Sequence, residues 1–180
     1  PLFESMKKRM PWLIVLLGLG MVVSSVVGVF EHVVTQLPII MAFQSLILDM
    51  AGNVGTQSLA VTIRVRMDES LTGKQKLPPV FKEMRIGFCN GLLLGVLSFA
   101  VIGLFIFLFK GKTMMFAFSV SACIGIALLL AMLISSAVGT CIPLFFKKIH
   151  IDPAVASGPL ITTVNDLVAV VTFYGLSWLF

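Results

Sequence analysis

PWLIVLLGLGMVVSSVVGVF, residues 11–30, is a stretch without a single charged side chain. A helix needs about 20 predominantly apolar residues to cross a bilayer, so this stretch predicts a membrane-spanning helix. Four further apolar runs follow at about 37–63, 86–109, 114–146 and 153–180. The sequence therefore predicts an all-α membrane protein with five transmembrane helices, which form one domain over residues 1–180.

The composition indicates the same fold class. Of the 180 residues, 58% are hydrophobic and only 12% are charged, which is unlike a soluble domain. The net charge of +5 could suggest a nucleic-acid partner, but the basic residues lie between the apolar runs rather than in one patch. We expect contact with the lipid bilayer and no nucleic acid. No serine or cysteine is paired with a histidine deep in the apolar runs, so we expect no enzyme.

The lysines and arginines divide unequally between the two sides of the predicted membrane domain. Eleven lie before 11–30, within 64–85 or just after 114–146, whereas only Lys110 and Lys112 lie on the opposite side. Because cytoplasmic loops are enriched in basic residues, we expect a cytoplasmic N-terminus and an extracytoplasmic C-terminus. The segment 64–85 is then a cytosolic loop in which Pro78-Pro79 argues against one continuous helix and Glu83 is solvated.

Two acidic residues lie deep within apolar runs, namely Asp49 and Asp166. An aspartate at the centre of a transmembrane helix costs roughly 2.5 to 3.5 kcal/mol on insertion scales, so each needs compensation. No lysine or arginine lies at a comparable depth. The remaining explanations are protonation, a water-filled cavity or a bound cation.

Both acids are accompanied by oxygen-bearing and small residues at helical spacing. Asp49, Asn53 and Gln57 share one face of a helix, with Gly52, Gly55 and Thr56 beside them. Gly158, Thr162 and Asp166 share a face of the last helix, with Thr163 and Asn165 adjacent. Such oxygen donors suit a hard cation such as Mg²⁺, which keeps much of its water. Purely structural explanations stay open, because amides also hydrogen-bond between membrane helices and a carboxyl group can be protonated.

Two further features have structural or functional explanations. Asp152 precedes Pro153, where it would either cap the last helix or form an ion site at the cytosolic mouth. Gly87, Gly91 and Gly95 recur at steps of four, a spacing that predicts close packing against another helix.

Two segments resemble the MgtE family of magnesium channels. PIIMAFQSLILDMAGNVGTQS, residues 38–58, is similar to the family's second-helix signature, in which a proline leads to an Asp and then to Gly-Asn-x-Gly-x-Gln. GTCIPLFFKKIHIDPAVASGPLITTVNDLVAVVTFYG, residues 139–175, is similar to the region where an Asp-Pro opens a helix and a Thr-rich stretch reaches an Asp. The lead-in MKKRMPWLIVLL, residues 6–17, also fits the family, so the resemblance covers most of the predicted membrane domain.

The resemblance implies a homodimer whose ion path lies at the subunit interface, lined by the helices at 37–63 and 153–180. It implies that Asp166 is the main pore acid, which two copies of the chain could turn toward one cation. Asp152 matches the acid at the cytosolic start of the same helix. The matches to the pore-lining motif are Gly52, Asn53, Gly55 and Gln57.

Family members also carry cytosolic N-terminal and CBS domains, which usually sense magnesium and close the pore. Neither is present within residues 1–180. Because the sequence begins at Pro1 rather than Met, we expect it to be a piece of a longer protein.

We therefore expect a multi-pass protein of the cell (inner or plasma) membrane that passes Mg²⁺, or other divalent cations, into the cytoplasm. The expected metal-contacting residues are Asp166, Thr162, Asp152 and Asp49. The expected pore-lining residues are Gly52, Asn53, Gly55, Gln57, Gly158, Thr163 and Asn165. Two alternatives stay open: a proton- or sodium-coupled divalent-cation transporter, and a non-transporting membrane subunit.

Overall fold

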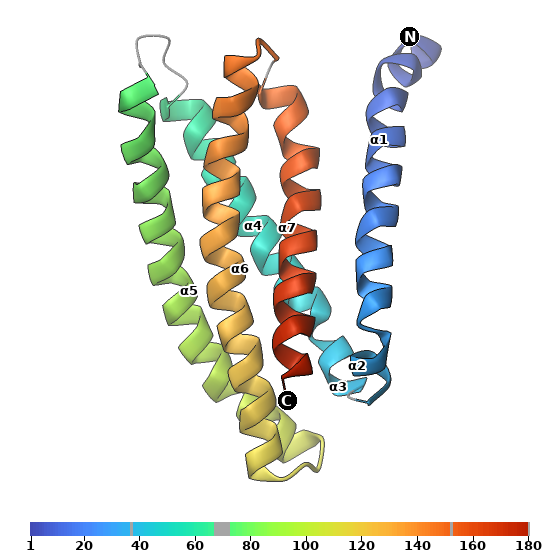
Figure 1. Ribbon diagram of the computed structural model, residues 1–180, viewed down its shortest axis with the longest axis vertical. Coiled ribbons are helices and arrows are strands. Elements are labelled where there is room, and N and C mark those ends of the chain that lie inside the picture. Colours follow the sequence, from blue (N-terminus) through green and yellow to red (C-terminus); the bar gives the residue numbers. More distant parts are fainter. Residues whose placement is uncertain (37, 67–72, 152, 180) are drawn as a thin grey trace.

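The helices of this chain follow the apolar runs of the sequence (Figure 1). The computed structural model describes residues 1–36, 38–66, 73–151 and 153–179. Within these ranges there is no strand, and five helical segments are long and apolar enough to cross a membrane, as predicted. The elements are α1 (Leu2–Val29), α2 (Glu31–Gln36), α3 (Pro38–Ala42), α4 (Gln44–Val61), the π-helical turn η1 (Thr62–Arg66), α5 (Gly73–Phe109), α6 (Met114–Lys148) and α7 (Pro153–Trp178).

The helix boundaries differ from the prediction in three places. α1 begins at Leu2 rather than at about residue 11, so the predicted lead-in is itself helical. The run at 37–63 is divided into α3 and α4 at Phe43, where the backbone (φ −98°, ψ 0°) departs from the angles of a regular α-helix. α5 already begins at Gly73 and continues through Pro78-Pro79, so the prediction of a non-helical segment as far as residue 85 was wrong. Both prolines lie within the first two turns of α5, where each removes only one backbone hydrogen bond.

The longer α5 also changes the surroundings of Glu83. This residue belongs to the helix and is only 7% exposed, so the prediction that it is solvated was wrong. Its carboxylate lies inside the helix bundle, where burial of a charge requires compensation.

α6 lies at the centre of the bundle and packs against α4, α5 and α7. Residues 114–146 carry no charged side chain, and a helix that is apolar on all sides is typically buried. Ile124, Leu128 and Ala131 on α6 are at most 1% exposed and form part of the core. The hydroxyl of Thr113 accepts a hydrogen bond of 3.2 Å from the backbone N–H of Phe116 and so caps the start of α6.

The glycines at 87, 91 and 95 of α5 all face α6. A Cβ atom on Gly95 would lie 2.9 Å from the carbonyl oxygen of Gly125, and one on Gly91 would lie 3.0 Å from the Cα of Leu129. Gly87 faces Ser136 in the same way. The missing side chains allow the two backbones to approach closely, which is how small residues join helices in membranes.

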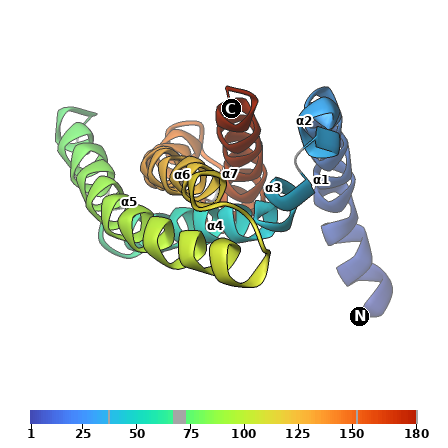
Figure 2. The same ribbon diagram turned by 90° about the horizontal axis from the view of Figure 1, so that it is seen from below.

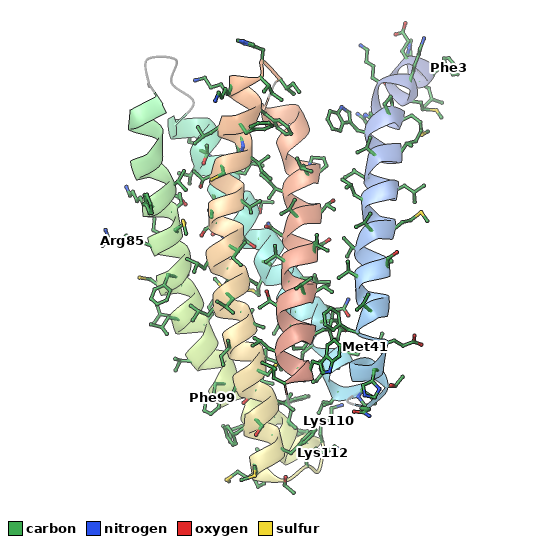
Figure 3. The ribbon with its side chains drawn as sticks, in the orientation of Figure 1. Phe3, Met41, Arg85, Phe99, Lys110 and Lys112 are labelled. Carbon is green, nitrogen blue, oxygen red and sulfur yellow. The ribbon has the colours of Figure 1, made fainter. Side chains whose placement is uncertain are left out.

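α1 stands apart from the other long helices, which Figure 2 shows most clearly. None of its residues is buried, and its main partner in the chain is α7. Phe30, just after α1, stacks on Tyr174 with ring centroids 5.9 Å apart. The N- and C-termini lie at opposite ends of the molecule (Figure 1), and Lys110 and Lys112 lie at the end opposite the N-terminus (Figure 3).

Candidate functional site

The two deep aspartates, which are far apart in the sequence, lie along the same groove. Asp49 comes from α4 and Asp166 from α7, two helices that pack against each other. The groove has a volume of about 860 Å³. We call it the carboxylate groove; its lining residues are Ser45, Leu46, Leu48, Asp49, Gly52, Asn53, Thr56, Thr162 and Asp166.

The periodicity of α4 explains why its polar residues reach the groove. Ala51, Val54 and Ser58 form the buried side of α4, and α6 and α7 are its main packing partners. Asp49 and Asn53 lie on a different side of the helix and are both exposed. Because residues four apart lie one turn apart on the same face, the carboxylate and the amide follow each other along the groove.

Two threonine hydroxyls in the groove donate their hydrogen atoms to their own helices. Thr56 Oγ1 donates to the carbonyl oxygen of Asn53 at 2.9 Å. Thr162 Oγ1 donates to the carbonyl oxygen of Gly158 at 3.1 Å. Since each hydroxyl hydrogen is already used, what remains on each oxygen is a pair of acceptor lone pairs. Both groups can therefore act as oxygen donors toward a cation or its water shell.

Asn165 and Gly55, both predicted to line the pore, lie behind the groove instead. Asn165 is fully buried and its Nδ2 atom donates to the carbonyl oxygen of Ala51 at 3.3 Å. The side-chain amide of Asn165 occupies the space that a Cβ atom on Gly55 would need. These two residues join α7 to α4 and thereby fix the relative position of the two groove walls.

The remaining predicted residues lie elsewhere. Gln57 lines a different, smaller cavity between α4, α5 and α6. Thr163 is half-buried and donates a hydrogen bond of 3.1 Å to the carbonyl oxygen of Pro159. Gly158 is half-exposed, one turn from Thr162, with open space where a side chain would be. Asp152 lies outside the described residues, so its prediction stays a prediction.

The groove also contains Thr56, which the sequence placed beside the Asp49 face, and Ser45, which the sequence analysis did not select. Ser45 precedes Asp49 by four residues. Extending the helical face one turn before Asp49 would have identified it.

The groove has the chemistry of a weak site for a hydrated cation. In the described part of the chain, neither Asp49 nor Asp166 forms an ion pair. Nor do the described residues contain a cluster of three or more His, Cys, Asp or Glu side chains that could enclose a metal ion. Two carboxylates with hydroxyl and amide oxygens beside them can attract a cation that keeps most of its water.

Comparison with known proteins places the chain in a family. Residues 44–176 match the MgtE family, described as divalent cation transporter. The chain is 34% identical over 173 residues to the magnesium transporter MgtE of Bacillus subtilis, covering 96% of this chain and 36% of that protein. It is 35% identical over 179 residues to the magnesium transporter MgtE of Enterococcus faecalis, covering 98% of this chain and 37% of that protein. It is 28% identical over 169 residues to the magnesium transporter MgtE of Thermus thermophilus, covering 94% of this chain and 35% of that protein.

The chain thus spans little more than a third of the length of these relatives. The matches and the five candidate membrane spans of the described residues identify a multi-pass protein of the cell membrane. This chain belongs to the MgtE family of divalent cation transporters.

Proposed function

We propose that this chain forms the membrane pore of a magnesium transporter and passes Mg²⁺ into the cytoplasm. The observation that carries the proposal is the carboxylate groove, in which Asp49 and Asp166 meet hydroxyl and amide oxygens between otherwise apolar helices. The name of the relatives, magnesium transporter MgtE, supports Mg²⁺ as the cargo.

The dimensions of the groove suit a hydrated ion. Mg²⁺ loses water reluctantly, and six waters at the density of the liquid occupy roughly 180 Å³. The groove has a volume of about 860 Å³, so the ion can enter with its shell. Asp166 and Asp49 attract the divalent charge, while Thr162, Thr56 and Asn53 contact the shell. Binding of this kind is weak enough for the ion to leave, which conduction requires.

We further propose that the ion path lies between two copies of the chain. In one chain, α4 and α7 supply the walls of an open groove. A two-fold axis along the groove would place a second set of the same oxygens opposite the first, because a two-fold interface brings identical surfaces together. Two Asp166 carboxylates would then face one divalent cation, which offsets their mutual repulsion.

The direction of transport follows from the distribution of charge. The basic residues near the N-terminus, α5 and the end of α6 outnumber Lys110 and Lys112, so the N-terminal end is assigned to the cytoplasm. The membrane potential favours entry of a cation by about 2.3 kcal/mol per charge per 100 mV, and Mg²⁺ carries two charges.

Uptake of Mg²⁺ into liposomes tests this proposal. The purified protein is reconstituted with a fixed membrane potential and without a proton or sodium gradient, beside Asp166→Asn and Glu31→Gln. Glu31 is exposed and lies outside the groove, so its variant controls for the loss of one acidic charge. We expect wild type and Glu31→Gln to take up Mg²⁺ and Asp166→Asn to be at least tenfold slower. Uptake that requires a proton or sodium gradient would indicate a coupled transporter, and equal uptake by Asp166→Asn would contradict the proposed ion path.

A further inference from the structure

Glu83 is a buried carboxylate on the opposite side of α4 from the carboxylate groove. It is 7% exposed and borders a cavity of about 150 Å³ that is lined by α4, α5 and α6 and is open on the side of the exposed residues Gln57 and Asn90. We call this space the Glu83 cavity; its lining residues are Val54, Gln57, Ser58, Val61, Glu83, Ile86, Gly87, Asn90 and Ser136. None of these residues lines the carboxylate groove, so the two sites are separate.

Close helix contacts hold the walls of the Glu83 cavity together. A Cβ atom on Gly87 of α5 would lie 2.8 Å from the Cβ of Ser136 and 3.0 Å from the carbonyl oxygen of Met132 on α6. A Cβ atom on Gly139 of α6 would lie 3.0 Å from the Cβ of Ser58 on α4. Because the helices already touch at these glycines, the backbones that carry Ser58, Glu83 and Ser136 are held close together, whereas Gln57 and Asn90 lie at the exposed edge of the cavity.

The carboxylate of Glu83 has one hydrogen-bond donor and no counter-charge among the described residues. Ser58 Oγ donates to Glu83 Oε2 at 3.2 Å. No ion pair joins Glu83 to any lysine or arginine in the part of the chain that the structure describes. Its neighbours Lys82 and Arg85 are exposed, and Figure 3 shows Arg85 on the outer side of α5, away from the bundle. A buried carboxylate is unfavourable unless a positive charge compensates it, so the space beside Glu83 is a place where a cation would be stabilised.

The donors around Glu83 are oxygen atoms of neutral groups. Gln57 and Asn90 each carry an amide oxygen at the cavity. Ser136 Oγ donates its hydrogen to the carbonyl oxygen of Leu133 at 2.8 Å, so its lone pairs remain free. One carboxylate with three neutral oxygen donors has the ligand chemistry that a hard cation prefers.

We propose that the Glu83 cavity binds a monovalent hard cation such as Na⁺. A single positive charge neutralises the single carboxylate, whereas a divalent ion would leave a net charge buried in the bundle. The bound cation would join α4, α5 and α6 on the side facing away from the proposed ion path. This site does not depend on the proposed transport of Mg²⁺.

Thermal unfolding of the purified protein in detergent tests this site. NaCl replaces N-methyl-D-glucamine chloride at constant ionic strength, and EDTA removes divalent cations. Because a ligand that binds only the folded state stabilises it, we expect a saturable rise in Tm of about 3 °C in wild type. Glu83→Gln should show no rise, whereas Glu31→Gln should respond like wild type. Asp166→Asn should also respond like wild type, which separates the Glu83 cavity from the carboxylate groove.

Several outcomes would overturn the site. A wild-type Tm that does not depend on Na⁺ would show that the cavity binds no sodium. A Glu83→Gln protein that responds like wild type would place the Na⁺ elsewhere. A rise caused by MgCl₂ in the Asp166→Asn background, and lost on adding Glu83→Gln, would make the site divalent. If Glu83→Gln does not fold, Ser136→Ala and Asn90→Leu keep the carboxylate and should raise the half-saturating Na⁺ concentration about tenfold; unchanged values would overturn the assignment.

Discussion

Asn165 of α7 donates a hydrogen bond of 3.3 Å from Nδ2 to the backbone carbonyl oxygen of Ala51 in α4, directly behind the carboxylate groove. Asn165 is fully buried, and its neighbour in the sequence, Asp166, lines the groove. Successive helical residues differ in direction by about 100°, so one turns into the helix interface while the other turns to the opening. The contact between the two helices therefore determines where the Asp166 carboxylate lies relative to Asp49.

Replacing Asn165 with leucine should weaken both stability and transport. The substitution removes the hydrogen bond to Ala51, which is worth about 1 kcal/mol between membrane helices, and changes the shape of a buried side chain. We expect Tm to fall by a few degrees and Mg²⁺ uptake to fall with it, because Asp166 shifts. Thr163→Val is the matched control, since the Thr163 hydroxyl donates to the carbonyl of Pro159 in its own helix and to no other helix among the described residues. An Asn165→Leu protein with unchanged Tm would contradict the role of this contact.

Gly55 and Gly52 should respond differently to alanine. A Cβ atom on Gly55 would collide with the Asn165 amide, whereas a Cβ atom on Gly52 has nothing within 4 Å. Gly55→Ala should therefore lower Tm, and Gly52→Ala should leave Tm unchanged even if uptake changes. In a double-mutant cycle, Asn165→Ala should restore part of the Tm lost in Gly55→Ala, because it removes the amide with which the added Cβ atom collides. Additive effects of the two changes on Tm would show that the residues are not coupled.

The contact between α5 and α6 at Gly95 and Gly125 should be equally intolerant of added volume. A Cβ atom on Gly95 would lie 2.9 Å from the carbonyl oxygen of Gly125, which is backbone and cannot move aside cheaply. We expect Gly95→Ala to destabilise the protein by about 1 to 3 kcal/mol, the usual cost of overpacking. Gly20→Ala is the control, because nothing lies within 4 Å of its Cβ position. Equal Tm values for the two variants would contradict this packing.

The hydroxyl of Thr162 should contribute to transport through its oxygen rather than through its shape. Its hydrogen is donated to the carbonyl of Gly158, and its lone pairs remain for the ion's water shell. Thr162→Val keeps the shape and removes the oxygen, so we expect Mg²⁺ uptake in liposomes to fall about fivefold, corresponding to about 1 kcal/mol. Thr162→Ser keeps the hydroxyl and should retain most of the uptake. A serine variant as slow as the valine variant would favour a role in packing instead.

The sequence was sufficient for those properties that depend on short stretches of chain. Lipid offers no hydrogen bonds to the backbone, so an apolar run of sufficient length must form a helix, whatever surrounds it. The five spans could therefore be predicted. The start of α5 could not, because Pro78-Pro79 indicated a break where the helix is continuous. Asp49 and Asp166 could be selected as candidates for the same reason, because the cost of a charge in an apolar helix is a local property.

The direction in which each helical side chain points was decided by the tertiary structure alone. Sequence spacing grouped Gln57 with Asp49 and Asn165 with Asp166, yet Gln57 lines the Glu83 cavity and Asn165 joins α7 to α4. Glu83 was assigned to solvent from its charged surroundings and lies buried against Ser58. A helical face is defined only relative to the helices that pack against it, and those neighbours come from distant parts of the chain. The sequence by itself determined which segments cross the membrane and which of them carry charge, whereas packing between α4, α5, α6 and α7 determined which oxygen atoms meet.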